Sequence, residues 1–258
     1  MVGGNVNSIP FLDDRYPVRT VYTDSADWQR HADWQHFGTR NAALQDFVRT
    51  PLKRIVYAFE AHSGNVLAVS DEGGGFVEVA EVTDAMGLTD GCDALVTAAP
   101  GVMLCVRTAD CLPLFLYDSK KHAAAIAHCG WRNICNGIVS NTVDMMAERF
   151  GTNPKDAIAA FGPGICGKCY EVGNELVKAF SKRFSPDEAS GLFTSKANGK
   201  LLLDLRRAAS LELFRMGVES ENVHDAGICS YESEAYPSYR RNGPSEFGRQ
   251  MLSGIVLT

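Results

Sequence analysis

The sequence lacks the features that define several large classes of proteins. It has no uninterrupted apolar stretch of about 18 residues, the minimum for a membrane-spanning helix. Its first twenty residues contain neither the basic nor the apolar segment of a secretory signal peptide. The formal net charge of -6 disfavours a general nucleic-acid binder, which needs a basic surface. We therefore expect a cytoplasmic protein that contacts no nucleic acid and no membrane.

Two motifs that would name a reaction are also missing. The phosphate-binding pattern GxxxxGK[ST] is absent, and so is the GxSxG pattern that carries the nucleophile of many serine hydrolases. The eight cysteines follow no regular spacing, and most lie inside apolar runs, which favours reduced thiols over a disulfide framework. Cys166 and Cys169 have the spacing of a zinc-binding pair, but no second pair accompanies them, so we expect an ordinary loop with two thiols.

The apolar pattern predicts a layered domain with mixed sheets. Short apolar runs separated by turn residues predict strands at 54–62, 65–71, 93–99, 101–109, 112–119 and 123–129. Helical spacing follows at 133–151, 173–184 and 204–217, and single strands are expected at 156–162, 221–228 and 249–257. Segments 26–38 and 41–50 read as helix or loop. Many neighbouring strands followed by alternating helices and strands indicate an α/β or α+β layered domain.

Three potential ligands for a soft metal stand at the ends of predicted strands. His62 ends one strand, Cys111 follows another, and His128 lies at the end of a third. Thiolate and imidazole are the ligands that zinc prefers, and neighbouring strands bring their ends to one edge of a sheet. Each residue alone is also compatible with an ordinary core thiol or a hydrogen-bonded histidine. The sequence leaves these two interpretations about equally supported.

Charged residues near these strand ends supply further candidates. Arg132 directly follows Trp131 and has the geometry to bind phosphate or carboxylate through two hydrogen bonds, although it could equally pair with a structural acid. Arg107 interrupts an otherwise apolar strand. We predict catalytic roles for Cys111, His128 and Arg132.

Polar residues in the adjoining segments complete the predicted site. Asp93 and Asp110 could orient a ligand histidine or fix a turn. Tyr170 and Glu171, which follow the thiol loop, could supply an acid or a base. We predict substrate-binding roles for Arg107, Asp110, Tyr170 and Glu171.

Several motifs in a fixed order give the sequence a resemblance to a known family. AHSGNV, DALVT, TADCLPL, HCGWR, GPGICGKCYEVG, LDL and SYRRNG recur in this order between residues 54 and 258. Together they resemble the laccase-domain family, also called the multicopper polyphenol oxidase-like or purine nucleoside phosphorylase family. The resemblance implies one domain over residues 1–258, an α+β fold with four α/β/β/α layers, and a metal site on His62, Cys111 and His128.

The sequence also departs from the family pattern. Glu60 and Ala61 stand where Gln and Val are usual, Cys129 replaces a common alanine, and Asn133 replaces a common glycine. The segments of the family that usually precede His62 are not recognisable in residues 1–53.

The resemblance implies a purine nucleoside enzyme, and other reactions remain open. We expect a zinc-dependent purine nucleoside phosphorylase that uses phosphate and acts on adenosine, inosine, guanosine and methylthioadenosine, with adenosine deaminase activity. A cysteine hydrolase that edits a peptidoglycan precursor, with Cys111 as nucleophile and His128 as base, is the alternative. Copper is the less favoured metal, because six histidines without a His-x-His pair do not build a multicopper cluster. A metal-binding protein without activity is a third possibility. We expect a monomer or weak homodimer.

Overall fold

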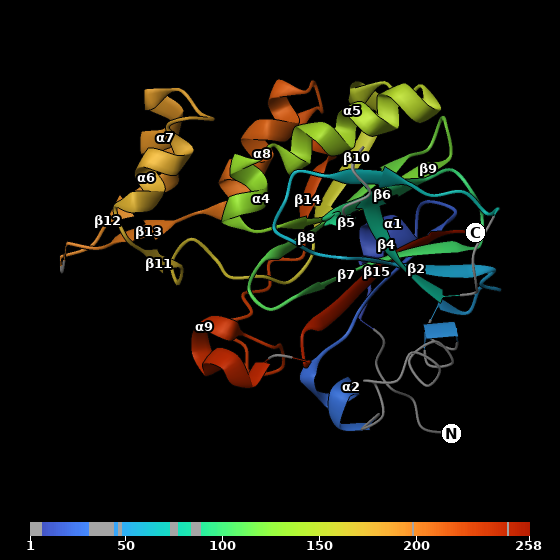
Figure 1. The fold of residues 1–258 in the computed structure, drawn as a ribbon, viewed down its shortest axis with the longest axis horizontal. Helices are drawn as coiled ribbons and strands as arrows, with labels where there is room; N and C mark the ends of the chain where they lie inside the picture. Colours follow the sequence, from blue (N-terminus) through green and yellow to red (C-terminus); the bar gives the residue numbers. More distant parts are fainter. Residues whose placement is uncertain are drawn as a thin grey trace.

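Two six-stranded mixed sheets form the centre of the molecule. The computed structural model describes residues 7–30, 44–45, 48–72, 77–83, 89–197, 199–246 and 248–258 (Figure 1). The first sheet has the order β1-β15-β7-β2-β4-β5 and the second the order β14-β10-β8-β9-β6-β3. The strands of the first are β1 (Val18–Tyr22), β15 (Met251–Leu257), β7 (Val102–Thr108), β2 (Arg54–Ala58), β4 (Val77–Thr83) and β5 (Thr89–Gly91).

The second sheet contains the two consecutive strands predicted at 112–119 and 123–129. Its strands are β14 (Val223–Asp225), β10 (Ala157–Phe161), β8 (Leu112–Asp118), β9 (Ala123–Cys129), β6 (Ala94–Thr97) and β3 (Val66–Ala68). β8 and β9 pair antiparallel from Leu112 opposite Cys129 to Asp118 opposite Ala123. Both strands are buried along their whole length. A strand covered on both faces needs apolar residues at every position, which explains why these segments read as continuous apolar runs.

The alternation along β8 shows how the two sheets are stacked. Leu112, Leu114 and Leu116 pack in the cluster that includes the helices, whereas Phe115 and Tyr117 pack in the cluster shared with the first sheet. Successive side chains of a strand point to opposite faces, so each face of β8 belongs to a different layer. The second sheet therefore lies between a helical layer and the first sheet.

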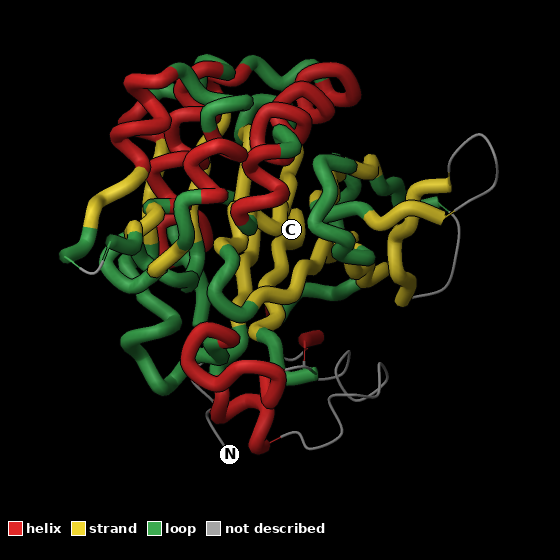
Figure 2. Tube along the Cα trace, turned by 60° about the vertical axis from the view of Figure 1, so that its left-hand side comes forward, coloured by secondary structure: helices red, strands yellow, loops and turns green. Residues whose placement is uncertain are grey.

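The helical layer consists of α4 (Trp131–Cys135), α5 (Ile138–Phe150) and α8 (Leu205–Arg215). Figures 1 and 2 show these helices gathered on one side of the strands. The single helix expected at 133–151 divides at Gly137, which has a φ of 81° that favours glycine. Asp204 caps the N-terminus of α8, because its side chain accepts a hydrogen bond from the Arg207 N–H at 3.0 Å.

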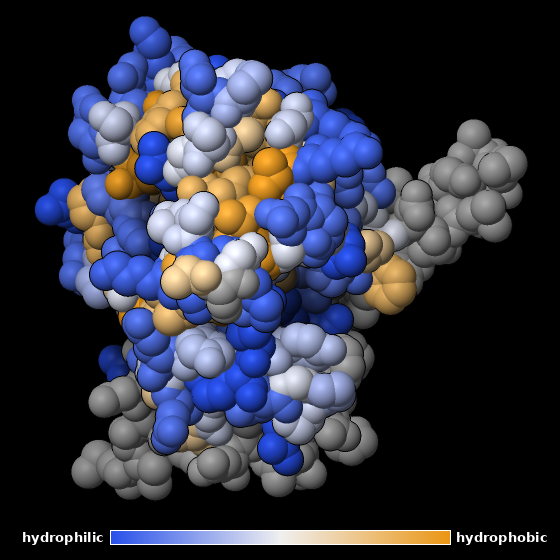
Figure 3. Space-filling model, turned by 90° about the vertical axis from the view of Figure 1, so that its left-hand side faces the viewer, coloured by the Kyte–Doolittle hydropathy of each residue, from blue (hydrophilic) through white to orange (hydrophobic). Residues whose placement is uncertain are grey.

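A smaller lobe extends from this layer. It contains the three-stranded sheet β11 (Glu171–Val172), β13 (Leu201–Leu203) and β12 (Phe193–Ser195), with α6 (Glu175–Phe180) and α7 (Pro186–Leu192). Figure 3 views the molecule from this side and shows apolar side chains gathered in the upper part, above a mainly hydrophilic surface. The remaining short elements are α1 (Pro10–Asp13), α2 (Ser25–Arg30), α9 (Tyr239–Asn242), η1 (Pro154–Asp156), η2 (Ser220–Asn222) and η3 (Gly243–Glu246).

The outer face of the first sheet is also covered. Leu44, Val48 and Leu52 belong to one buried cluster with Ile55 of β2 and Met103 of β7. Residues 31–43 and 46–47, which include most of the two segments expected to be helix or loop, lie outside the described residues. The α+β class with mixed sheets is confirmed. None of the helices in the described part of the chain is long and apolar enough to cross a membrane.

Candidate metal centre and active site

The three predicted ligands meet where the two sheets face each other. His62 lies in the loop between β2 and β3, Cys111 in the connection from β7 to β8, and His128 in β9. One ligand atom from each lies within 4.8 Å of the others, and the rings of His62 and His128 are 5.1 Å apart. The connection that carries Cys111 leaves the first sheet and enters the second. This crossover places the Cys111 thiol beside His62, which comes from a loop, and His128, which comes from a strand.

Asp93 organises both histidines. Its carboxylate lies 3.0 Å from Nδ1 of His128 and accepts hydrogen bonds from the backbone N–H groups of His62 and Ser63 at 3.2 and 2.6 Å. Burial alone would raise the pKa of Asp93, but hydrogen bonding and charge attraction from His128, with Ser63, lower it to about 2. The ionised carboxylate thus fixes one ring nitrogen of His128 and leaves Nε2 for a metal.

Asparagine side chains hold the loop of His62 against the helical layer. Nδ2 of Asn133 donates to the Ser63 carbonyl at 3.0 Å, and Nδ2 of Asn136 donates to the His62 carbonyl at 3.2 Å. His62 itself has a φ of 56°, an uncommon conformation for a residue with a side chain. Asn133, one of the departures from the family pattern, therefore has a structural role, because it ties α4 to the loop that carries His62.

Cys111 and His128 form a coupled acid–base pair. Burial would raise the pKa of Cys111, but the charge and hydrogen bond of His128, with those of His62, lower it to about 7. Burial would lower the pKa of His128, and Cys111 and Asp93 more than offset this and raise it. The thiol consequently loses its proton easily. A thiolate beside imidazole nitrogens is the donor set that zinc and other soft metals require.

A pocket of about 470 Å³ opens beside this donor set and contains most of the predicted site. It is lined by the three predicted metal ligands and by Arg107, Asp110, Arg132 and Tyr170. The volume lies within the usual range for small-molecule sites. Glu171 is not among the lining residues. Its carboxylate instead pairs with Lys196 and Lys200 at 2.7 and 2.6 Å.

Arg132 presents a free guanidinium to the pocket. It stacks on the ring of Trp131 at 4.3 Å, and in the part of the chain that the structure describes it forms no ion pair with a carboxylate. Among the described residues, no acid is therefore found for the structural ion pair that was one of the two roles considered for Arg132. A stacked, exposed guanidinium is well suited to bind an anionic ligand through parallel hydrogen bonds.

Asp110 is held by one side-chain and one backbone hydrogen bond. One oxygen of its carboxylate accepts from the Ser230 hydroxyl at 2.7 Å, and the other accepts from the Arg240 N–H at 2.6 Å. Its φ of 90° is strained for a residue other than glycine, at a cost of about 1–3 kcal/mol. The hydrogen bonds compensate for this strain, so Asp110 shapes the turn that presents Cys111.

Sequence reasoning assigned no role to several residues that also line the pocket. These are Glu60, Tyr239, Arg240, Glu246 and Gln250. The Arg240 guanidinium lies 5.1 Å from the ring centre of Tyr170, and the Glu60 carboxylate lies 3.8 Å from Nε of Arg107. Tyr239 and Arg240 belong to the SYRRNG motif, which was the only signal that pointed to them. The motif does not indicate that Arg240, 130 residues after Asp110, lies in the same pocket.

The comparisons with known proteins agree with these motifs. The chain belongs to the family described as multi-copper polyphenol oxidoreductase laccase, whose profile matches residues 25–258. The match thus begins earlier than residue 54, where the motifs become recognisable.

Three similar proteins have been given functions. A purine nucleoside phosphorylase of Bacteroides thetaiotaomicron is 35% identical over 80% of this chain and 74% of its own. Adenosine deaminase RL5 from an unknown prokaryotic organism is 37% identical over 74% of this chain and 71% of its own. Purine nucleoside phosphorylase YlmD of Bacillus subtilis is 33% identical over 81% of this chain and 73% of its own.

Solved structures share the fold. The crystal structure of YlmD from Geobacillus stearothermophilus has a TM-score of 0.76 at 25% identity and covers 93% of this chain and 92% of its own. A protein of Neisseria meningitidis has a TM-score of 0.71 at 28% identity and covers 93% of this chain and 94% of its own. These neighbours confirm the mixed α+β arrangement that the motifs predicted.

Proposed function

We propose that this protein is a zinc-dependent purine nucleoside phosphorylase with adenosine deaminase activity. One observation supports this function best: a His–Cys–His donor set lines the same pocket of nucleoside size as the Arg132 guanidinium, which pairs with no carboxylate among the described residues. Two of the similar proteins are named as purine nucleoside phosphorylases and one as an adenosine deaminase. Adenosine, inosine, guanosine and methylthioadenosine are the proposed substrates.

The donor set fits zinc by its chemistry. His62, Cys111 and His128 would hold the ion, and Asp93 already holds the second ring nitrogen of His128, as the partners of zinc-ligating histidines usually do. Three protein ligands leave one position of a tetrahedral ion open, which is typical of a catalytic site. When bound there, zinc would supply a Lewis acid that polarises substrate atoms and lowers the pKa of water.

In phosphorolysis, the chain's own residues orient two reactants. A phosphate oxygen attacks C1′ of the ribose, the bond from C1′ to the purine nitrogen breaks, and the products are the free base and ribose 1-phosphate. Arg132 binds the phosphate, and Arg107 lies in the same pocket to add a second positive charge. Tyr170 and Trp131 provide aromatic surfaces for the nucleoside. Holding both reactants in one geometry lowers the entropic cost of their reaction.

In deamination, water replaces phosphate as the attacking group and reaches C6 of the adenine ring. The pocket residues then hold the base near the donor set while ammonia leaves and inosine forms. The zinc-deaminase signatures H-x-E and P-C-x-x-C do not occur in the chain, so this activity would rest on a different arrangement of ligands.

The test is to incubate the purified, zinc-loaded protein with adenosine, with and without phosphate. Adenine and ribose 1-phosphate should form only with phosphate, and inosine should form without it. Arg132→Gln should lower the phosphorolysis rate far more than the deamination rate. Zinc-loaded protein that releases none of these products contradicts the proposal.

A specific observation also favours a second function, a cysteine hydrolase that edits a peptidoglycan precursor. Cys111, His128 and Asp93 form a connected thiol–imidazole–carboxylate series, and the pKa of Cys111 is lowered to about 7. The same series defines a nucleophile, its base and the group that orients the base. Thiol labelling separates the two functions: a nucleophilic Cys111 reacts with iodoacetamide at once, whereas a zinc-bound Cys111 reacts only after a chelator is added.

We also propose that residues 1–258 form one domain that acts in the cytoplasm as a monomer or weak homodimer. We prefer zinc to copper because six histidines without a His-x-His pair do not build a multicopper cluster. Intense blue colour and copper in the purified protein would overturn that preference.

A further inference from the structure

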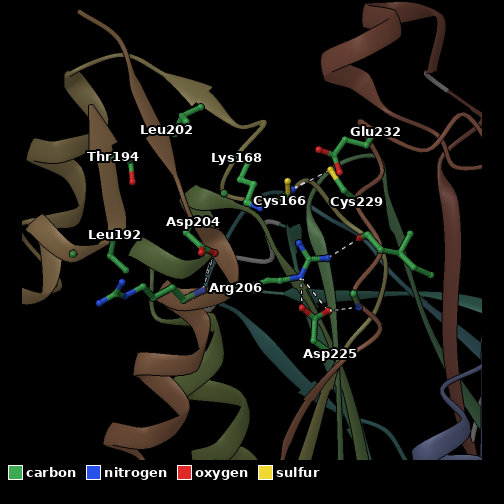
Figure 4. Close-up of a pocket in the computed structure, with 15 residues that line it drawn as sticks. Cys166, Lys168, Leu192, Thr194, Leu202, Asp204, Arg206, Asp225, Cys229 and Glu232 are labelled. Atoms are coloured by element: carbon green, nitrogen blue, oxygen red, sulfur yellow. Dashed lines mark hydrogen bonds and ion pairs between the residues drawn. The ribbon is translucent and has the colours of Figure 1, made fainter. Parts of the chain in front are cut away.

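A second group of metal-ligand side chains lies outside the pocket described above. Cys166 and Cys169 lie in the loop after β10, and Cys229 and Glu232 lie in the loop after β14. One ligand atom from each of the four residues lies within 4.8 Å of the others. Figure 4 shows Cys166, Cys229 and Glu232 converging at the edge of a separate pocket. The sequence pair Cys166 and Cys169 is therefore completed by residues about sixty positions later.

Strand pairing explains why these two loops meet. β10 and β14 run parallel as neighbours, and the pairing continues past both strands into a bridge between Gly164 and Cys229. The Gly164 N–H donates to the Ile228 carbonyl at 3.2 Å, and the Cys166 N–H donates to Sγ of Cys229 at 3.3 Å. Sγ of Cys169 lies 3.3 Å from Glu232 Oε1. The four side chains are thus placed by backbone contacts.

The loop itself does not have the fold of a nucleotide-binding loop. Gly162, Gly164 and Gly167 are spaced as in the GxGxxG motif, but the chain continues from them into β11 rather than into a helix. At Gly164 a Cβ would lie 2.6 Å from the Leu112 side chain, so the glycine serves close packing against β8. The loop's thiols remain without a role in nucleoside binding.

We propose that Cys166, Cys169, Cys229 and Glu232 bind a structural zinc ion. Three thiolates and one carboxylate are ligands that zinc accepts, and four protein ligands fill its tetrahedral shell. Around an ion at 2.0–2.3 Å, tetrahedral ligand atoms lie about 3.3–3.8 Å apart, which is compatible with ligand atoms that all lie within 4.8 Å of one another. Closed coordination leaves no position for a substrate, so this zinc stabilises the fold and takes no part in the reaction.

Arg206 prepares the site for the ion. Its guanidinium donates to the carbonyls of Gly164, Ile165 and Ile228, which belong to the two loops that carry the ligands. Nε of Arg206 pairs with the Asp225 carboxylate at 3.0 Å, which anchors the guanidinium at the end of β14 (Figure 4). Loops held in this way pay less ordering entropy when the ion binds.

The site also supports the substrate pocket. Tyr170, a wall of that pocket, directly follows Cys169, and Ser230, which donates to Asp110, directly follows Cys229. The Ile165 N–H donates to the Asp110 carbonyl at 2.8 Å. An ion between the loops would therefore fix the turn that presents Cys111 and the aromatic wall opposite it.

Metal analysis tests the site without any activity measurement. Both proteins are purified without chelator. The variant in which Cys166 and Cys229 are replaced by serine should contain one zinc ion per molecule fewer than the unchanged protein. Cys135→Ser, a half-buried thiol outside both donor groups, is the matched control and should retain the zinc content of the unchanged protein. In a His62→Ala/His128→Ala background, which takes both histidines from the first donor group, cobalt loading should still give intense thiolate-to-cobalt absorption, because all three thiolate ligands of the second group remain.

Labelling of the unchanged protein gives a readout that does not depend on the variants folding. Peptide mass spectrometry should show Cys166, Cys169 and Cys229 protected from iodoacetamide until a chelator is added. Equal labelling with and without chelator, a disulfide among these cysteines, or the same zinc content in the double-serine variant would each overturn the proposal. None of these results bears on phosphorolysis, so this proposal can fail while the proposed function stands.

Discussion

Replacing Asp93 by asparagine tests how the metal centre is organised. The carboxylate accepts hydrogen bonds from the His62 N–H and His128 through Oδ1, and from the N–H groups of Ala61 and Ser63 and the Ser63 hydroxyl through Oδ2. Asparagine has the same shape but only one acceptor oxygen. Whichever way the amide is turned, its NH₂ group faces N–H donors that have lost their partner.

The magnitude follows from two separate effects. Loss of an outer-shell partner of a ligating histidine typically weakens metal binding about 10- to 100-fold, or about 1.4–2.7 kcal/mol. The shift of the Asp93 pKa from 3.8 to about 2 corresponds to roughly 2 kcal/mol of folding stability. Because the folded-state pKa is the lower one, this stability is present above pH 4 and lost as the pH falls toward 2. Asp93→Asn should remove that part of the acid dependence.

The assay is zinc competition against a chelating indicator, together with unfolding curves of the metal-free protein between pH 3 and 7. Asp118→Asn is the control, because Asp118 is equally buried, accepts from the N–H groups of Lys120 and Lys121, and lies at the opposite end of β8 from Cys111. It should cost stability and leave zinc affinity unchanged. If Asp93→Asn binds zinc as tightly as the unchanged protein, Asp93 does not organise the centre.

Four further changes follow from the site. In metal-free protein, the rate of Cys111 alkylation should rise with pH around a midpoint near 7, and His128→Ala should move that midpoint upward, as peptide mass spectrometry would show. Gly130→Ala places a Cβ 2.8 Å from Cys111 Sγ and should weaken zinc binding about tenfold or more in the same competition assay. Arg132→Gln should raise the KM for phosphate about 10- to 100-fold, since it removes a charged hydrogen-bond donor; an unchanged KM would exclude Arg132 from phosphate binding. Glu171→Gln should change kcat/KM by less than about twofold, because its carboxylate pairs with lysines outside the pocket.

The sequence predicted the central sheets well because burial on both faces leaves a strong signal. β7, β8 and β9 are apolar at nearly every position, and their ends coincide with the residues that interrupt the apolar pattern. The division of the predicted helix at Gly137 was missed, since an isolated glycine within a helical pattern does not by itself indicate a break. The pairing of β1 with β15 joins opposite ends of the chain, and no local pattern indicates such a contact.

The sequence predicts the site residues that lie at the ends of strands. It does not predict those that come from loops distant in sequence. His62, Cys111 and His128 each follow or end an apolar run, so their convergence could be expected. Arg240 reaches the pocket through a hydrogen bond to Asp110 across 130 positions of sequence. Cys229 likewise joins Cys166 only because β10 and β14 are neighbours. The sequence alone therefore shows no partner for Cys166 and Cys169, because the residues that the structure places beside them are about sixty positions away.

The two donor groups are connected by a short series of contacts. Asp110, whose strained turn presents Cys111, is held by Ser230, which adjoins Cys229. The turn at Asp110 depends on the thiol loops more than they depend on it. It needs hydrogen bonds from other segments to keep its positive φ, whereas the thiol loops are also held by Arg206. Loss of an ion at the second group would therefore loosen the turn at Asp110 before it unfolded the sheets.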